Sequence, residues 1–218
     1  MPWHLVDGVQ LPDQVAGHVA LEFCNTRAGW GSPQPKEYLV SDRALVLWAA
    51  DTGLRPIEDA AVAWRADGAD RSGPASVADR SGLAVDRALA LREAVYRCAQ
   101  RTDDPAPWRL LGEAAARARE HAVLLPGQPG QPATWQVPAE PGGPGERFPD
   151  RAADQVLYAV ALAAEALLTS PLALTVAACP GIGCGWLFTD PRHRRRWCTM
   201  AVCGTRAKAR RHAERLRE

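Results

Sequence analysis

The sequence predicts a mainly α-helical protein with a small β element (α+β). A helical N-terminal domain is expected to precede a small cysteine-rich domain that ends in a basic helix. Four segments of the first 171 residues space their apolar residues as helices do, and one short segment alternates like a strand. Paired cysteines and clustered arginines share the C-terminal end. We therefore expect two domains, 1–171 and 172–218, the first with a core of its own.

Composition and length point to a cytoplasmic globular protein. The chain has 218 residues, of which 47% are hydrophobic and 23% are charged, so it can bury a core. Its first ten residues lack the basic start and apolar run of a signal peptide. The apolar stretch 156–178 is interrupted by Glu165 and Pro171 before about 20 apolar residues accumulate, so no membrane span is expected.

A half-buried strand is expected over residues 17–27. The segment reads "GHVALEFCNTR", in which Val19, Leu21 and Phe23 alternate with more polar or smaller residues. This alternation would direct the side chain of Cys24 away from the core.

A short helix is predicted next, over residues 41–53. Ser41 or Asp42 can serve as its N-cap, and Gly53 can end it. The polar, glycine-bearing residues 65–82 that follow indicate a surface connection.

Two amphipathic helices are predicted over residues 84–101 and 107–122. Each repeats an apolar residue every three or four positions. The stripes are Val85, Ala88, Leu91, Val95 and Cys98 in the first helix, and Trp108, Leu111, Ala115, Ala118 and Ala122 in the second. Cys98 is best explained as a small buried residue.

Residues 126–149 contain seven prolines and five glycines, which excludes a helix. A hairpin that pairs "AVLLP" with "TWQVP" remains feasible. Residues 150–169 then predict a long helix whose wide apolar face suits the centre of the core. Pro171 should end or kink this helix.

Four cysteines follow the pattern C-x4-C-x13-C-x4-C, namely Cys179, Cys184, Cys198 and Cys203. Two such pairs can converge on one tetrahedral metal centre, and four protein ligands leave no open position for a substrate. We therefore expect one structural Zn²⁺ per chain.

Alternatives to a zinc site stay open for these cysteines. Four thiolates also suit an iron–sulfur cluster, and the cysteines could instead be free and buried. Disulfides are disfavoured in a reducing compartment. His193 or His212 could substitute as a ligand.

Residues 190–218 are strongly basic, with ten Lys or Arg against three Asp or Glu, whereas the rest of the chain carries sixteen against twenty-two. The final segment predicts a helix that docks through Ala209, Ala213 and Leu216. Its remaining residues would form a basic surface for nucleic acid, with DNA favoured and RNA left open. A solvated basic tail is the simpler alternative. The candidate contacts are Arg194, Arg195, Arg196, Arg206, Lys208, Arg210 and Arg211.

Two segments resemble known families. "CGWLFTD" with "RRRWCTMAVCGTRAKARRH" resembles the CGNR zinc finger, although Thr205 replaces the asparagine of the Cys-Gly-Asn-Arg run. "ALEFCNTR" is similar to the signature that opens the ABATE domain, the usual partner of this finger in stress-induced bacterial transcription regulators. The resemblance implies a mostly helical regulatory domain and a DNA-binding end with four cysteine ligands. It favours Arg195, Arg196, Arg206 and Lys208 as DNA contacts.

The expected function is a DNA-binding transcription regulator whose body senses a small-molecule effector or forms a homodimer. No G-x-S-x-G, phosphate loop or His-Glu metal pair is present, so we do not expect an enzyme. One alternative is a small-molecule-binding or enzymatic body with the finger as a structural clasp. Asn25, Thr26 and Arg27 are the candidate ligand contacts, although Asn25 and Thr26 suit a cap or turn better. Another alternative is a redox or metal sensor that uses the zinc-bound thiolates.

Overall fold

The computed structural model describes residues 2–55, 83–130, 132–138 and 152–217. The described chain is mainly helical and contains four short antiparallel strand pairs, which confirms the predicted α+β class. Its α-helices are α1 (Val19–Asn25), α2 (Asp42–Asp51), α4 (Leu83–Ala99), α5 (Pro105–Glu120), α6 (Ala152–Leu168) and α7 (Thr205–Arg215). Its hairpins are β1 (Trp3–Val6) with β2 (Val9–Pro12), β3 (Arg27–Ala28) with β4 (Lys36–Glu37), β5 (Val123–Leu125) with β6 (Thr134–Gln136), and β7 (Val176–Ala178) with β8 (Leu187–Thr189).

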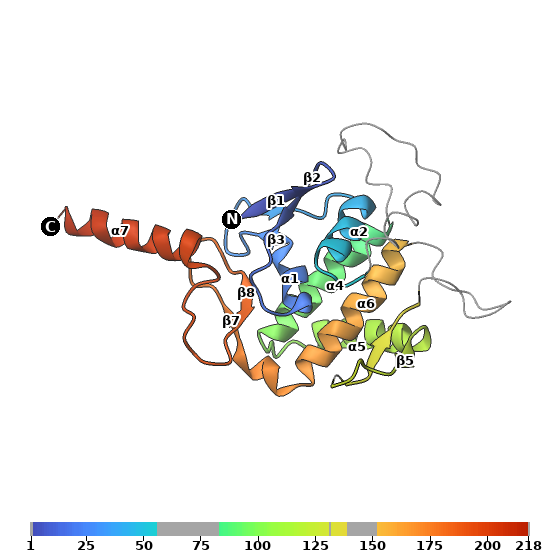
Figure 1. Ribbon diagram of the computed structural model, residues 1–218. Coiled ribbons are helices and arrows are strands. Elements are labelled where there is room, and N and C mark those ends of the chain that lie inside the picture. The colour runs from blue at the N-terminus through green and yellow to red at the C-terminus, as the bar shows by residue number, and fades with distance from the viewer. Residues whose placement is uncertain (1, 56–82, 131, 139–151, 218) are drawn as a thin grey trace.

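Helix α6 is central to the body, as its wide apolar face predicts. It contacts α1, α2, α4 and α5, which surround it in Figure 1. Val156, Val160 and Leu167 are each 1% exposed. The helix ends before Pro171, which begins a short 3₁₀ helix, η2 (Pro171–Thr175).

The other body helices follow their sequence signals closely. The Ser41 hydroxyl caps α2 by accepting from the Ala44 N–H at 3.2 Å. All five residues of the α4 stripe are buried, including Cys98. The α5 stripe is buried except at its ends. Trp108 is 42% exposed, and its indole N–H donates to the Thr102 carbonyl oxygen.

The strand expected over residues 17–27 is wrong, because Val19–Asn25 form helix α1. The His18 ring caps this helix by accepting from the Ala20 N–H. Helix α1 packs against α4 and α6, and also against β8, so it is buried on several sides. The alternation of apolar residues along this segment therefore does not show which side chains face the core. Cys24, expected to point away from the core, lies inside it at 0% exposure.

Two of the hairpins bear directly on the sequence analysis. The pairing of β5 with β6 confirms the hairpin expected between residues 122–126 and 134–138. The β1–β2 hairpin was not expected, although its Asp7–Gly8 turn, with both residues at positive φ, is a strong hairpin signal. The surface connection expected over residues 65–82 lies outside the described residues. Among the described helices, none is long and apolar enough to cross a bilayer.

Helix α7 extends away from the body (Figure 1). The docking stripe expected at Ala209, Ala213 and Leu216 is wrong, because all three are exposed. Ala207 is the buried residue of this helix. The few apolar side chains of α7 are too small or too distant from the body to hold the helix against it.

Candidate metal centre and basic surface

The four cysteines form one compact, buried cluster. Their Sγ atoms all lie within 4.8 Å of one another, and each residue is at most 4% exposed. Two of the Sγ–Sγ distances are 3.7 Å, for Cys184 with Cys198, and 3.6 Å, for Cys198 with Cys203. A tetrahedral zinc ion with Zn–S bonds of about 2.3 Å requires Sγ–Sγ distances of about 3.8 Å. The cluster therefore fits one structural zinc, and His193 and His212 are not members of it.

Local backbone geometry brings each ligand to the cluster. Cys179 directly follows β7, and its N–H donates to the Trp186 carbonyl oxygen at 2.8 Å. Glycine suits the turn to Cys184, because a Cβ at Gly181 would lie 3.0 Å from the Cys203 Sγ and would crowd the cluster. Cys203 lies in η3 (Met200–Gly204), a π-helical turn that leads directly into α7. The metal ligand and the basic helix are thus covalent neighbours.

The close approach of the sulfur atoms shifts the pKa values of two of the thiols in opposite directions. The pKa of Cys179 is lowered because Cys184 and Cys198 donate hydrogen bonds to its sulfur. The pKa of Cys184 is raised because its thiol is the donor to Cys179. Full deprotonation of such a group requires a cation among the sulfurs, which is the role that zinc fulfils when bound.

The two remaining cysteines lie outside this cluster. Burial raises the pKa of the Cys24 thiol and raises that of Cys98 to about 11, so both stay protonated. The Cys24 thiol also donates to the Ala20 carbonyl oxygen. Both residues pack in the core, as expected for Cys98.

The loop between the cysteine pairs is shaped by Asp190. Its carboxylate accepts from the backbone N–H groups of Arg194 and Arg195 at 3.0 and 2.9 Å. Arg194 and Arg196 are exposed. Arg195 is exposed as well, but its guanidinium donates to the carbonyl oxygens of Val15 and Cys198, so it ties the loop to the body and to a metal ligand.

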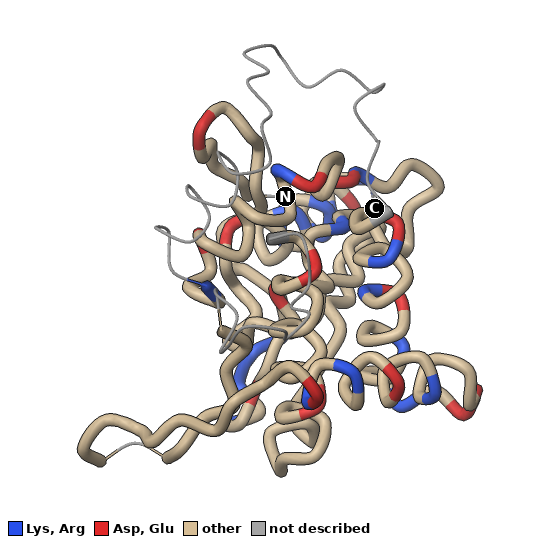
Figure 2. Tube along the Cα trace, turned by 90° about the vertical axis from the view of Figure 1, so that its right-hand side faces the viewer, with Lys and Arg blue, Asp and Glu red and all other residues tan. Residues whose placement is uncertain are grey.

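Helix α7 presents its cations to solvent. Arg206, Lys208, Arg210 and Arg211 are all exposed. Within the described residues, none of them takes part in an ion pair of 4.0 Å or less. Acidic and basic residues are interspersed on the face of the body turned away from α7 (Figure 2). The predicted contacts therefore lie together at one end of the molecule, except that Arg195 is engaged by the protein itself.

Asn25 joins the body to the finger. Its side-chain amide donates to the Leu187 carbonyl oxygen and accepts from the Leu187 N–H, both at 2.9 Å. Both residues are 0% exposed. The amide thus pairs with strand β8 as the backbone of a neighbouring strand would. Sequence reasoning assigned Asn25 to a cap, a turn or a ligand and missed this contact.

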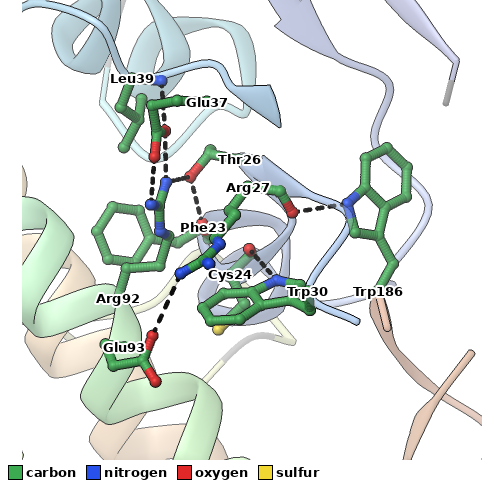
Figure 3. Close-up of polar contacts among 10 residues, drawn as sticks. All are labelled: Phe23, Cys24, Thr26, Arg27, Trp30, Glu37, Leu39, Arg92, Glu93 and Trp186. Atoms are coloured by element: carbon green, nitrogen blue, oxygen red, sulfur yellow. Dashed lines mark hydrogen bonds and ion pairs between the residues drawn. The ribbon is translucent and has the colours of Figure 1, made fainter. Parts of the chain in front are cut away.

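Trp30 and Tyr96, here called the aromatic seat, contact the residues after Cys184. The backbone N–H of Trp30 donates to the Cys184 carbonyl oxygen, and the Tyr96 hydroxyl donates to the Gly185 carbonyl oxygen at 2.8 Å. The Trp30 and Tyr96 rings stack with centroids 3.6 Å apart. A Cβ at Gly185 would lie 2.7 Å from the Trp30 Cβ, so only glycine fits. The Trp186 indole N–H donates to the Arg27 carbonyl oxygen (Figure 3).

Thr26 and Arg27 lie beside this seat and also have partners in the protein. The Thr26 hydroxyl donates to the Phe23 carbonyl oxygen and accepts from Arg92, which also binds the Glu37 carboxylate (Figure 3). The Arg27 guanidinium lies 3.7 Å from Glu93 and 4.6 Å from the centroid of the Trp30 ring. Ligand binding by Asn25, Thr26 and Arg27 stays a prediction.

A cavity of about 840 Å³ lies elsewhere, between α2, α6 and β6. Small side chains of α6, including Ala159 and Ala163, form one wall, and Trp135 contributes to another. None of the three predicted ligand contacts lines it. Alanines on a helix are equally compatible with a packed core and with a cavity wall, so the sequence does not predict this cavity.

The fold and the metal centre define a zinc-finger protein with a helical N-terminal body. Residues 17–171 match the family model of ABATE, described as "Putative stress-induced transcription regulator". Residues 176–216 match the CGNR zinc finger. The chain therefore belongs to the ABATE family and carries a CGNR zinc finger, which confirms the resemblance seen in the sequence. The comparison with curated proteins finds no match.

Proposed function

We propose that the chain is a transcription regulator that binds DNA through α7 and the arginines of the preceding loop. The observation that carries the proposal is the group of exposed cations on a helix that leaves the body directly after a zinc ligand. Each cation that meets a phosphate releases condensed counterions, which strengthens binding. Membership of a family described as a transcription regulator supports the same function.

The dimensions of α7 suit a duplex. Eleven helical residues extend about 16 Å, and the major groove of B-DNA is about 12 Å wide and admits one α-helix. Arg206, Lys208, Arg210 and Arg211 would face phosphates or base edges. Arg194 and Arg196 would contact the adjoining backbone, whereas Arg195 would hold the loop in place.

Removal of charge tests the proposal. The quadruple variant Arg196→Ala, Arg206→Ala, Lys208→Ala and Arg210→Ala should bind a duplex weakly. The slope of log Kd against log salt should flatten by roughly 0.9 for each lost contact. Wild-type affinity in this variant would contradict DNA binding by this surface.

The matched control removes exposed arginines from α5. Arg109→Ala with Arg117→Ala removes two cations from the body and should leave both affinity and salt slope unchanged. An equal loss per cation in the control would show attraction by net charge alone.

A body that binds a small molecule, with the finger as a clasp, is the second candidate. The cavity between α2, α6 and β6 favours it, because binding cavities commonly have volumes of about 300–1,000 Å³. A thermal-shift screen of apolar compounds against wild type and the cavity-filling variant Ala163→Trp tests this function. A ligand that stabilises only the wild type, together with unchanged duplex affinity in the quadruple variant, would favour the clasp.

The remaining properties of the regulator are part of the proposal. Absence of enzymatic activity, homodimerisation and a cytoplasmic location would all accompany a DNA-binding role. A sensor of oxidants would need access to the zinc thiolates, and their burial below 5% exposure disfavours such access.

A further inference from the structure

Helix α7 receives little support from the rest of the molecule. Of its eleven residues, Ala207 alone is buried. Most helical stability in proteins comes from packing of an apolar face, and isolated helices shorter than about 12–15 residues are marginal in water. Residues 209–215 therefore depend on their own sequence for helicity.

The charges of α7 disfavour a helix in water. Arg206 with Arg210, and Arg211 with Arg215, are like-charge pairs four positions apart on the helix surface. The first turn contains no acidic residue, and Arg206 and Lys208 lie near the positive end of the helix dipole. Arg210 with Glu214 is an opposite-charge pair at the same spacing, and Arg215 suits the last turn. Charge therefore weakens the helix through its two like-charge pairs and its first turn wherever these charges are not neutralised.

The first turn is held in a different way. It continues from η3, which contains the zinc ligand Cys203, and Ala207 is buried at 5% exposure. The Thr205 hydroxyl donates to the Met200 carbonyl oxygen at 3.1 Å. The metal centre therefore provides a fixed first turn from which a helix can propagate without a new nucleation step.

We propose that residues 209–215 become stably helical on a nucleic-acid duplex, and that the helical α7 of Figure 1 is the conformation that fits the duplex. Phosphates would neutralise the arginines that repel one another. The groove would supply the packing contacts that α7 does not make with the body. In the free chain only the zinc-anchored first turn is stably helical. The inference rests on the proposed function, because it requires a duplex as the partner.

Amide hydrogen exchange of the full-length, zinc-loaded protein tests the proposal. In the free protein, residues 209–215 should exchange at nearly the rate of an unstructured peptide, while residues 203–207 are protected. A random-sequence duplex should slow exchange of residues 209–215 by about tenfold or more.

Helix propensity provides an independent readout. Ala209→Gly and Ala213→Gly leave every charge in place but make the helix harder to form. Each should weaken duplex binding by about fivefold if ordering accompanies binding. Ala116→Gly, at an exposed position of the packed helix α5, is the matched control and should leave affinity unchanged.

The outcomes separate this inference from the proposed function. Duplex binding with equal protection of residues 209–215 in the free and bound protein would overturn the inference and leave the function standing. No duplex binding, with no gain in protection, would overturn both. Duplex binding with a gain in protection and weaker binding by the glycine variants supports both.

Discussion

At the scale of single residues, Asn25 has a structural role that the sequence did not reveal. Its amide makes two hydrogen bonds to the backbone of Leu187, 162 positions away in the chain. It lies in α1, whereas Leu187 begins the strand that follows two zinc ligands. One side chain thus holds the body and the finger in register.

The first prediction concerns this contact. Asn25→Ala would leave the buried N–H and carbonyl of Leu187 without partners, so the free energy of unfolding should fall by about 2–4 kcal/mol. Urea denaturation of the zinc-loaded protein measures this change. Gln14→Ala, which removes an exposed amide bonded to Asp51, is the control and should cost about 0.5 kcal/mol or less. Equal stabilities for the two variants would contradict the assigned role of Asn25.

The sequence predicted which residues bind metal better than it predicted which residues form hydrogen bonds with one another. The cysteine spacing predicted all four members of the metal cluster, because ligand geometry restricts which spacings converge. Arg195 reads as another exposed cation, yet its guanidinium binds the Val15 and Cys198 carbonyl oxygens. Such contacts depend on long-range folding, which residue type alone does not encode.

At the scale of elements, the predictions succeeded for the long helices and failed for the short helix α1 and for the docking of α7. Helix α4 shows a clear stripe because it has distinct buried and exposed sides. Helix α6 is nearly surrounded, but its seventeen residues carry a wide apolar face that indicates a central helix. Helix α1 is buried on several sides and has only seven residues, so its pattern matched a strand by chance. Helix α7 has hardly any buried side, and the docking stripe inferred for it does not exist.

The second prediction concerns the seat of the finger on the body. Gly185→Ala would place a Cβ 2.7 Å from the Trp30 Cβ, so the residues after Cys184 would shift away from the Trp30 and Tyr96 rings. We expect the unfolding free energy to fall by about 2–3 kcal/mol and zinc to be released at lower chelator concentration.

The matched control is Gly53→Ala. Gly53 has φ +69°, close to the +67° of Gly185, but a Cβ there would meet no atom of the described residues within 4 Å. It therefore carries the backbone strain without the collision, and it should lose only about 1 kcal/mol. Equal losses at the two positions, or unchanged zinc release in Gly185→Ala, would contradict the proposed seat.

At the scale of the whole molecule, the body and the finger share apolar surface. Leu187 of the finger belongs to the main core, and Trp186 and Phe188 pack with Ala28 and Tyr38 of the body. Two families match consecutive parts of the chain, but the apolar contacts do not follow that division. A sequence reveals the order of such parts more readily than the way they interlock.

The third prediction revises the expectation of an independent N-terminal core. A chain ending at residue 171 would lose Leu187 and expose the apolar residues that cover it, so it should melt without a cooperative transition. A chain ending at residue 204 keeps all four cysteines and should melt within a few degrees of the full protein, because α7 buries little. Cooperative melting of the shorter chain at the wild-type temperature would show that the finger adds nothing to the body.

We propose that zinc organises the basic surface through which the chain would bind DNA. The most direct test of this claim measures zinc content by mass spectrometry and duplex affinity by fluorescence anisotropy on the same samples. Cys198→Ala should lose zinc and bind the duplex at least about tenfold more weakly, whereas Cys98→Ala, which removes a buried thiol outside the cluster, should retain one zinc and wild-type affinity. Wild-type affinity and salt dependence in a zinc-free Cys198→Ala protein would contradict the claim.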